Sequence, residues 1–328
     1  MSAAAPGPDP RQPAPARSHP ASPTPVTDPS PCEDTMDNLL GVHALVFTGR
    51  WDEPSARRAL RATAEAGYDL IELPLLDPAA TDPVMTRRLL AEHGLGASCS
   101  LGLSFDADVS SPDEAVAARG LTRLREALAV ARGIGASYLG GVIYSALGKY
   151  PHPATPAGRA NAVHALRTLA GEAADDGIHL GVEVVNRYET NLCNTAEQAL
   201  ELLDEVDAPN VVVHLDTYHM NIEEPDVDSP VRRCADRLGY VHVGESHRGA
   251  LGTGNVDFPG FFAALAEVGY GGPITFESFS SAVVSQELSS ALAVWRNLWD
   301  DGPQLAADAR SFVAAQLAAS GGRSATGR

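Results

Sequence analysis

Three acidic residues and one histidine each follow a short apolar run in the second half of the chain. They are Glu183, Asp216, His242 and Glu277, and successive members are 33, 26 and 35 residues apart. Each interval is about the length of one strand–loop–helix–loop unit. Three carboxylates and one imidazole form a mostly oxygen ligand set, which suits Mn²⁺, Mg²⁺ or Co²⁺ better than structural zinc. The spacing therefore predicts a divalent-metal site, provided that the strands bring these residues together.

The rest of the chain shows the alternation of elements that such a site requires. Eight apolar runs predict strands at Gly41–Phe47, Leu70–Leu73, Ala97–Leu101, Tyr138–Ile143, Leu180–Val185, Val211–Asp216, Tyr240–Val243 and Ile274–Glu277. Amphipathic stretches predict helices at Pro54–Ala66, Pro83–His93, Pro112–Ile134, Thr155–Asp176, Thr195–Val206, Ser229–Arg237 and Phe258–Val268, and two more at Gln286–Trp299 and Gln304–Ala319. Alternating strands and helices form a parallel sheet, and eight units favour a closed α/β barrel, the (β/α)₈ TIM barrel. Residues that end successive strands then meet at one mouth of the barrel.

The first 36 residues differ in composition from the rest. Residues 1–35 hold ten of the 24 prolines, with alanine and serine between them. Such a segment cannot bury enough apolar surface to offset the entropy lost on ordering. We therefore expect a disordered tail over residues 1–36 and a single barrel domain over residues 37–328.

Charge and cysteine usage exclude several classes of protein. The chain has 42 acidic and 24 basic residues, a formal net charge of −18, and so an acidic surface would repel the phosphates of a nucleic acid. No apolar run approaches the ~20 residues of a membrane span, and the N-terminal stretch lacks the apolar core of a signal peptide. Four scattered cysteines without a CxxC pair favour a reducing compartment. These features predict a cytoplasmic protein with neither a nucleic-acid nor a membrane partner.

A second set of polar residues follows the first at short intervals. Glu189 lies six residues after Glu183, His219 three after Asp216, and Arg248 six after His242. They fall in the loops above the same mouth, where the substrates of such barrels bind. A single charged loop residue is usually solvated surface. Each of these three, however, follows a member of the first set by only a few residues, which favours a binding role. His214 instead lies within a predicted strand, so we interpret it as a hydrogen-bonded residue of the barrel interior.

Three longer motifs resemble a known family. They are EVVNRYE at residues 183–189, LDTYHMNIEE at residues 215–224 and HVGESHR at residues 242–248. They are similar to the ketose 3-epimerases, that is, the D-tagatose 3-epimerase and D-allulose (D-psicose) 3-epimerase family of the xylose isomerase-like TIM barrels. The likeness runs from about Gly41 to the C-terminal helices and is nearest to the D-allulose 3-epimerases.

The resemblance implies roles for individual residues. It implies that the four residues of the first set hold one divalent ion per chain, Mn²⁺ before Co²⁺ or Mg²⁺, and that Glu189, His219 and Arg248 hold the O1–O3 end of a sugar. His43 and Phe47 occupy positions where the family places substrate-facing rings, although many members have a more aromatic first strand. The resemblance also implies a homodimer or homotetramer.

The chemistry of such a site follows from its residue types. Epimerisation at C3 of a ketose removes a proton next to the C2 carbonyl, and a divalent cation stabilises the enediolate charge that forms. Inversion needs an acid–base group on each face of C3, because one base that returns its own proton changes nothing. Glu183 and Glu277 would be these groups. The predicted activity is interconversion of free ketohexoses, D-fructose with D-allulose and D-tagatose with D-sorbose.

Three other functions stay open from the sequence. An aldose–ketose or hydroxypyruvate isomerase would use the same barrel and differ in the product formed from D-fructose. An endonuclease-IV-like zinc phosphodiesterase needs a histidine-rich cluster and a basic DNA-binding face, which the net charge of −18 disfavours. A sugar-binding barrel without catalysis would show no metal-dependent turnover.

Overall fold

The eight strands of the protein close into a barrel in which every strand runs parallel to its neighbours. The computed structural model describes residues 1–3 and 38–324, so the tail expected over residues 1–36 lies almost wholly outside the described residues. The strands are β1 (Leu40–His43), β2 (Leu70–Pro74), β3 (Gly96–Leu103), β4 (Tyr138–Ala146), β5 (His179–Glu183), β6 (Val211–Asp216), β7 (Leu238–Val243) and β8 (Ile274–Phe276). Gly41 of β1 pairs with Leu70 of β2 on one side and Thr275 of β8 on the other, which closes the barrel. The predicted TIM barrel is confirmed.

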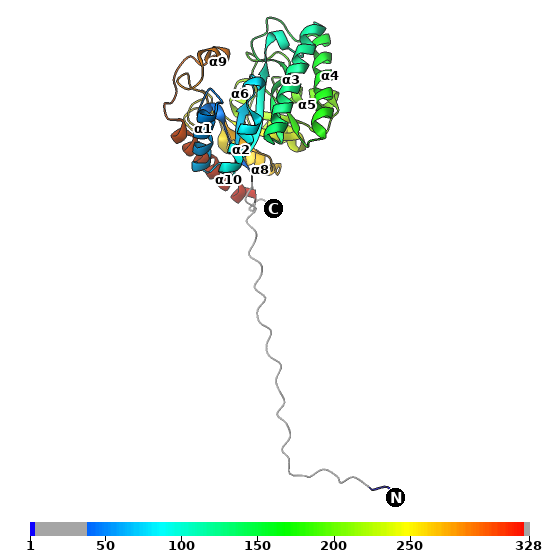
Figure 1. Ribbon diagram of the computed structural model, residues 1–328, viewed down its shortest axis with the longest axis vertical. Helices are drawn as coiled ribbons and strands as arrows, with labels where there is room; N and C mark the ends of the chain where they lie inside the picture. The colour runs from blue at the N-terminus through cyan, green and yellow to red at the C-terminus, as the bar shows by residue number, and fades with distance from the viewer. Residues whose placement is uncertain (4–37, 325–328) are drawn as a thin grey trace. The chain divides into compact units, whose positions relative to one another are not determined.

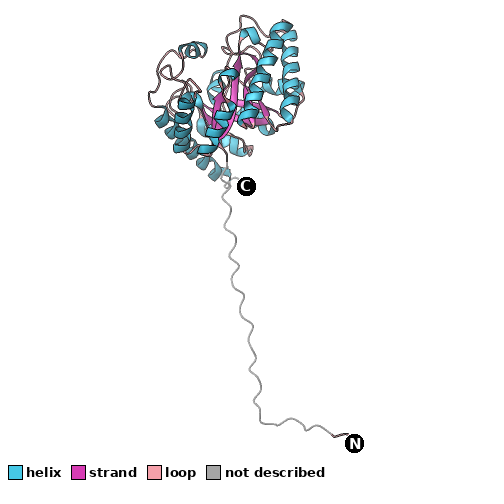
Figure 2. Cartoon of the chain, viewed as in Figure 1, coloured by secondary structure: helices cyan, strands magenta, loops and turns pink. Residues whose placement is uncertain are grey.

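Helices cover the outer face of the strands (Figures 1 and 2). They are α1 (Glu53–Glu65), α2 (Pro83–His93), α3 (Glu114–Ile134), α4 (Pro156–Ala174), α5 (Ala196–Val206), α6 (Thr217–Glu223), α7 (Ser229–Cys234), α8 (Phe258–Glu267), α9 (Gln286–Ala291) and α10 (Gly302–Ser324), with 3₁₀ helices η1 (Ala44–Val46), η2 (Pro78–Ala80), η3 (Phe105–Ala107) and η4 (Ala235–Arg237). Side chains cap many of the helix starts. The best example is α5, where Thr195 and Gln198 form a reciprocal capping box. None of the described helices has both the length and the apolar character needed to span a membrane.

Several predicted bounds differ by a few residues in the structure, and two elements end much earlier than expected. The first strand ends at His43 rather than Phe47, because the His43 side chain accepts a hydrogen bond from the backbone N–H of Leu45 and caps η1. The helix expected over Gln286–Trp299 ends at Ala291, since Ala293 adopts a left-handed φ of 53° that a continuing helix cannot accommodate.

The C-terminal helix is longer than expected and closes the ring of helices beside α1. α10 packs against both α8 and α1. The Tyr68 hydroxyl donates to the backbone carbonyl of Ala306 at 2.8 Å, and Arg310 donates to the carbonyl of Gly67 at 3.0 Å. These contacts join the C-terminal helix to the loop between α1 and β2, near the start of the barrel domain.

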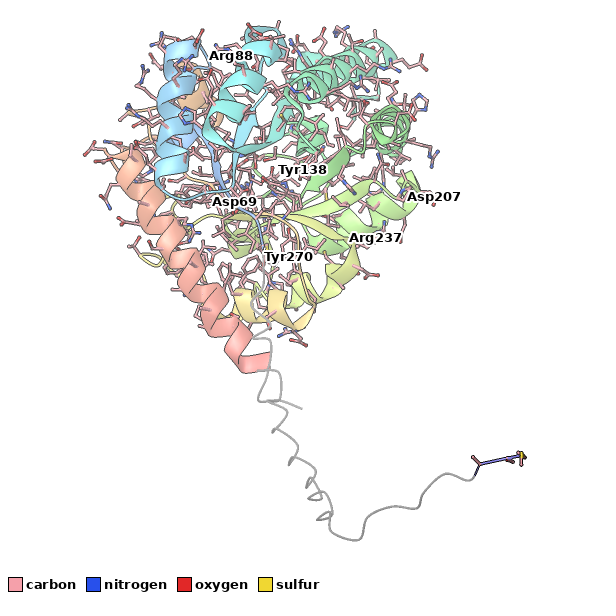
Figure 3. All side chains as sticks on the ribbon, turned by 60° about the horizontal axis from the view of Figure 1, so that its bottom comes forward. Asp69, Arg88, Tyr138, Asp207, Arg237 and Tyr270 are labelled. Atoms are coloured by element: carbon pink, nitrogen blue, oxygen red, sulfur yellow. The ribbon has the colours of Figure 1, made fainter. Side chains whose placement is uncertain are left out.

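The barrel interior is polar, while alternate strand residues join the apolar core. Ile71 and Leu73 of β2 belong to the core, whereas Glu72 between them is fully buried among polar groups. The ring of Tyr138 fills interior space that glycine leaves free, because a Cβ at Gly181 would lie 1.7 Å from its hydroxyl oxygen. Figure 3 labels Tyr138 among the strands. It also labels Asp69, Asp207, Arg237 and Tyr270, each of which comes before a strand, at the end of the barrel away from the predicted mouth.

Candidate metal centre and active site

The four predicted metal ligands come together at the carboxyl ends of β5 to β8. Glu183 and Asp216 end β5 and β6, His242 lies one residue before the end of β7, and Glu277 follows β8. All four are buried, and each offers a ligand atom within 4.8 Å of those of the others. Strand register causes this convergence. Asp216 pairs with His242 across β6 and β7, and Glu183 pairs with the strand residue two before Asp216.

The electrostatics of this cluster fit a bound cation. Burial, together with the Glu277 and Asp216 carboxylates, raises the pKa of Glu183 to about 7. Burial also raises the pKa of Asp216 above its ordinary value, and Glu277 adds to the rise. Carboxyl groups with raised pKa values gain from a positive charge placed among them. Three oxygen donors and one nitrogen donor in one place are a donor set for a hard divalent ion.

Arg248 supplies part of the positive charge. Its Nη1 donates to Asp216 Oδ2 at 2.9 Å and to Glu277 Oε2 at 2.6 Å. The guanidinium carbon lies 3.9 Å from the ring centre of Tyr218 and 5.1 Å from that of Phe279. Two aromatic faces and two carboxylates thus fix the orientation of the guanidinium group.

The loop that carries Arg248 is held in a constrained conformation. Arg248 has a φ of 61°, which is uncommon for a residue with a side chain. The buried Glu245 anchors the loop, because its carboxylate accepts hydrogen bonds from the backbone N–H groups of Ser246 at 2.7 Å and Gly252 at 2.9 Å. Strain that the surroundings enforce is common at functional sites.

The other two members of the second set lie beside Arg248. His219 is buried on α6, a short helix that the sequence did not predict and that Asp216 caps through the backbone N–H of Tyr218. One helical turn after Asp216, the Nε2 of His219 lies 3.5 Å from Asp216 Oδ2 and 3.1 Å from Arg248 Nη2. Glu189 Oε2 lies 4.0 Å from the same nitrogen. The structure therefore places Glu189, His219 and Arg248 together.

A cavity opens above the cluster, and Glu183, His242 and Glu277 line part of it. His43 lines it, with Nε2 3.9 Å from Glu277 Oε1, and the apolar side chains of Leu45 and Phe279 also face it. Phe47, the second predicted ring, is not among the lining residues in the described chain. It is half-buried and packs against the barrel core, because β1 ends early and η1 turns the chain.

Two buried residues of the barrel interior lie next to the cluster, and the sequence pointed to only one of them. His214 is fully buried, but only its Nδ1 has a partner, the Tyr138 hydroxyl at 2.9 Å, while its Nε2 has none among the described residues. The interpretation of His214 as a hydrogen-bonded residue of the barrel interior is confirmed through Nδ1. Glu72 was not singled out at all, although its Oε2 lies 2.8 Å from His242 Nε2. A carboxylate in the middle of an apolar strand was the signal that could have found it.

Comparison with known proteins agrees with this geometry. A family model described as "Xylose isomerase-like TIM barrel" matches residues 60–310. The chain is 56% identical over 273 residues to an L-ribulose 3-epimerase of Methylomonas sp. (strain DH-1), covering 83% of this chain and 96% of that protein. It is 53% identical over 280 residues to a ketose 3-epimerase of Arthrobacter globiformis, covering 85% and 97%.

A solved structure extends the likeness to three dimensions. The crystal structure of a D-allulose 3-epimerase from Methylomonas sp. in complex with D-allulose superposes with a TM-score of 0.84 at 55% identity, covering 85% of this chain and 97% of that one. The same barrel and more than half of the residues are shared over nearly the whole of that protein. The chain therefore belongs to the xylose isomerase-like TIM barrels and, within them, to the ketose 3-epimerase family.

Proposed function

We propose that the protein is a metal-dependent ketose 3-epimerase that interconverts free ketohexoses, D-fructose with D-allulose and D-tagatose with D-sorbose. The observation that carries this proposal is the buried cluster of Glu183, Asp216, His242 and Glu277, of which Glu183, His242 and Glu277 also line a cavity. The names of the relatives support it, since one is a ketose 3-epimerase and a similar structure holds D-allulose.

In this proposal the four clustered residues hold one divalent ion, with Mn²⁺ before Co²⁺ or Mg²⁺. Oxygen donors and a single imidazole favour these ions. When bound, the ion stabilises the negative charge that develops on the sugar as the C3 proton leaves. All further steps belong to side chains of the protein.

Glu183 and Glu277 are proposed as the two acid–base groups. Glu183 ends β5 and Glu277 follows β8, so two strands separate them around the barrel mouth and they approach the site from different sides. One carboxylate removes the C3 proton, and the other, in its acid form, returns a proton to the opposite face. The roles exchange when the reaction runs in reverse.

The remaining side chains hold the sugar. Glu189, His219 and Arg248 form one polar wall, which we assign to the O1–O3 end of the ketose. His43 faces the cavity from the other direction. Its Nδ1 accepts a hydrogen bond from the backbone N–H of Leu45, so its proton lies on Nε2, which faces Glu277 and the cavity. We assign His43 Nε2–H to a substrate hydroxyl and give Phe47 no contact with the sugar.

The decisive experiment is product analysis with metal-stripped protein. D-fructose should give D-allulose once Mn²⁺ is added, and EDTA should abolish turnover. An aldose product would instead support a 1,2-isomerase, and turnover that EDTA does not affect would contradict the metal centre. Sedimentation analysis tests the expected homodimer or homotetramer, and cell fractionation tests the expected cytoplasmic location.

A further inference from the structure

A carboxylate outside the four-residue cluster contacts one of its members on the side that faces away from the other three. Glu72, in the middle of β2, has no exposed surface. Its Oε2 accepts a hydrogen bond from His242 Nε2 at 2.8 Å. The other ring nitrogen, His242 Nδ1, lies 3.2 Å from Glu183 Oε1 on the cluster side. The imidazole therefore stands between the cluster and Glu72, with one nitrogen facing each.

This arrangement determines which ring nitrogen is available to a cation. An imidazole nitrogen binds a metal ion only through its lone pair, so the proton has to lie on the other nitrogen. Glu72 offers His242 Nε2 an acceptor that cannot donate when ionised. The proton is therefore kept on Nε2, and Nδ1, which faces Glu183 and the other ligand atoms, is the nitrogen whose lone pair a cation would use.

A hydroxyl network holds Glu72 in place. The Tyr240 hydroxyl donates to Glu72 Oε2 at 2.8 Å, and the hydroxyl oxygens of Ser98 and Thr275 each lie 2.7 Å from that of Tyr240. A tyrosine hydroxyl has one proton, so it accepts from both of these neighbours while it donates to Glu72. The ring of Tyr138 (labelled in Figure 3) stacks on that of Tyr240 with centroids 4.0 Å apart. Groups from β3, β7 and β8 thus fix one oxygen of this β2 carboxylate.

We propose that Glu72 is a positioning residue that fixes the orientation and the proton of His242, and that it thereby sets the affinity of the cluster for its divalent ion. This inference rests on the proposed metal-dependent function. Glu72 itself does not reach the substrate. It does not line the cavity, and no group of clustered metal ligands in the described chain includes it. A purely structural role would make Glu72 matter for folding stability but not for metal affinity.

Two substitutions separate these roles. Glu72→Met keeps the length of the side chain but removes the acceptor, and Glu72→Gln keeps an acceptor oxygen but removes the charge. The matched control is Asp108→Asn. Asp108 is another buried carboxylate that accepts a tyrosine hydroxyl, from Tyr150 at 2.6 Å, but no described histidine bonds to it and it does not line the cavity.

The measurement is Mn²⁺ binding to the full, metal-stripped chain by isothermal titration calorimetry. The Kd should rise about 10- to 100-fold in Glu72→Met, as is typical when the partner of a metal-binding histidine is lost, and about three- to tenfold in Glu72→Gln. Asp108→Asn should leave the Kd within about twofold while lowering the Tm. At saturating Mn²⁺ both Glu72 variants should recover kcat with an unchanged KM for the ketose. In ¹⁵N spectra of the Mg²⁺-loaded wild-type protein, the proton of His242 should reside on Nε2.

The outcomes distinguish failure of this inference from failure of the proposed function. A wild-type chain that binds no divalent ion would overturn the metal centre itself. A wild-type chain that binds Mn²⁺ while folded Glu72→Met binds it equally well would overturn only the role of Glu72. If Glu72→Met does not fold, Glu72→Gln decides: a Kd within twofold of wild type rejects the inference, and the predicted rise supports it.

Discussion

Two sets of arginine–carboxylate contacts lie in very different surroundings in this molecule. On the outside of the barrel, Arg57 and Arg88 bridge Glu53 and Glu92 of α1 and α2 with N–O distances of 2.7 to 2.9 Å, and all four side chains are 41–46% exposed. At the barrel mouth, Arg248 makes contacts of 2.6 and 2.9 Å with carboxylates that are almost completely buried. The contact lengths are nearly the same in both places.

The difference in surroundings determines what the contacts do. Water and salt screen the outer network (Arg88 is labelled in Figure 3), so it contributes little to stability. At the mouth the charges have little contact with water, so each carboxylate depends on Arg248 or a bound cation for compensation. An ion-pair distance alone therefore says little about importance, and the predictions below test this contrast from the largest expected effect to the smallest.

The acid–base pair should give the largest effect. Glu183→Gln and Glu277→Gln keep the size of each side chain but cannot take up the C3 proton. Each change should lower kcat for D-fructose by about 10²- to 10⁴-fold. Chromatography of the D-allulose formed measures this, with the Mn²⁺ content of each variant determined in parallel to separate loss of metal from loss of the base. A near-wild-type rate in either variant would refute the two-base mechanism.

Substitution of Arg248 should give the second-largest effect, and lysine should not replace its function. The guanidinium group contacts two carboxylates and is held between two aromatic rings, which an ammonium group cannot reproduce. Arg248→Lys should lower kcat/KM by about 100-fold, whereas Arg88→Lys on the surface should leave it unchanged. Equal tolerance of lysine at both positions would mean that burial does not distinguish the two sets of contacts.

His43 should show a smaller effect that is confined to substrate binding. Loss of one hydrogen bond to a sugar hydroxyl costs about 1 kcal/mol, so His43→Ala should raise KM about five- to tenfold with a smaller change in kcat. Phe47→Leu is the control, because Phe47 packs on the core and does not line the cavity. A larger rise in KM for the Phe47 variant than for the His43 variant would reverse these assignments.

The outer network should give the smallest effect. Arg88→Met removes contacts to Glu53 and Glu92 that solvent already screens. We expect a drop in Tm of less than about 2 °C and no change in turnover. Calorimetry at low and at high salt measures this. A drop of many degrees that disappears at high salt would show that the surface pairs matter as much as the buried ones.

Much of the molecule was predictable from local patterns. The eight strands and the seven helices between them follow from apolar periodicity and from turn residues, because each element has to bury its own apolar face. Glu183, Asp216, His242 and Glu277 could be found because each lies at the end of such a run, so that convergence needs only parallel strands in closed order. The long motifs around them carried the family resemblance independently of any geometry.

Tertiary structure decided which side chains meet across the barrel. Glu72 lies 170 residues from His242 along the chain, and only the closed barrel places them 2.8 Å apart. The early end of β1, after which Phe47 packs against the barrel core, depends on where the His43 side chain points. α6 forms because Asp216 caps it, and that in turn places His219. Local patterns determine the elements, whereas contacts between distant residues depend on register and side-chain direction, which no short stretch of the chain contains.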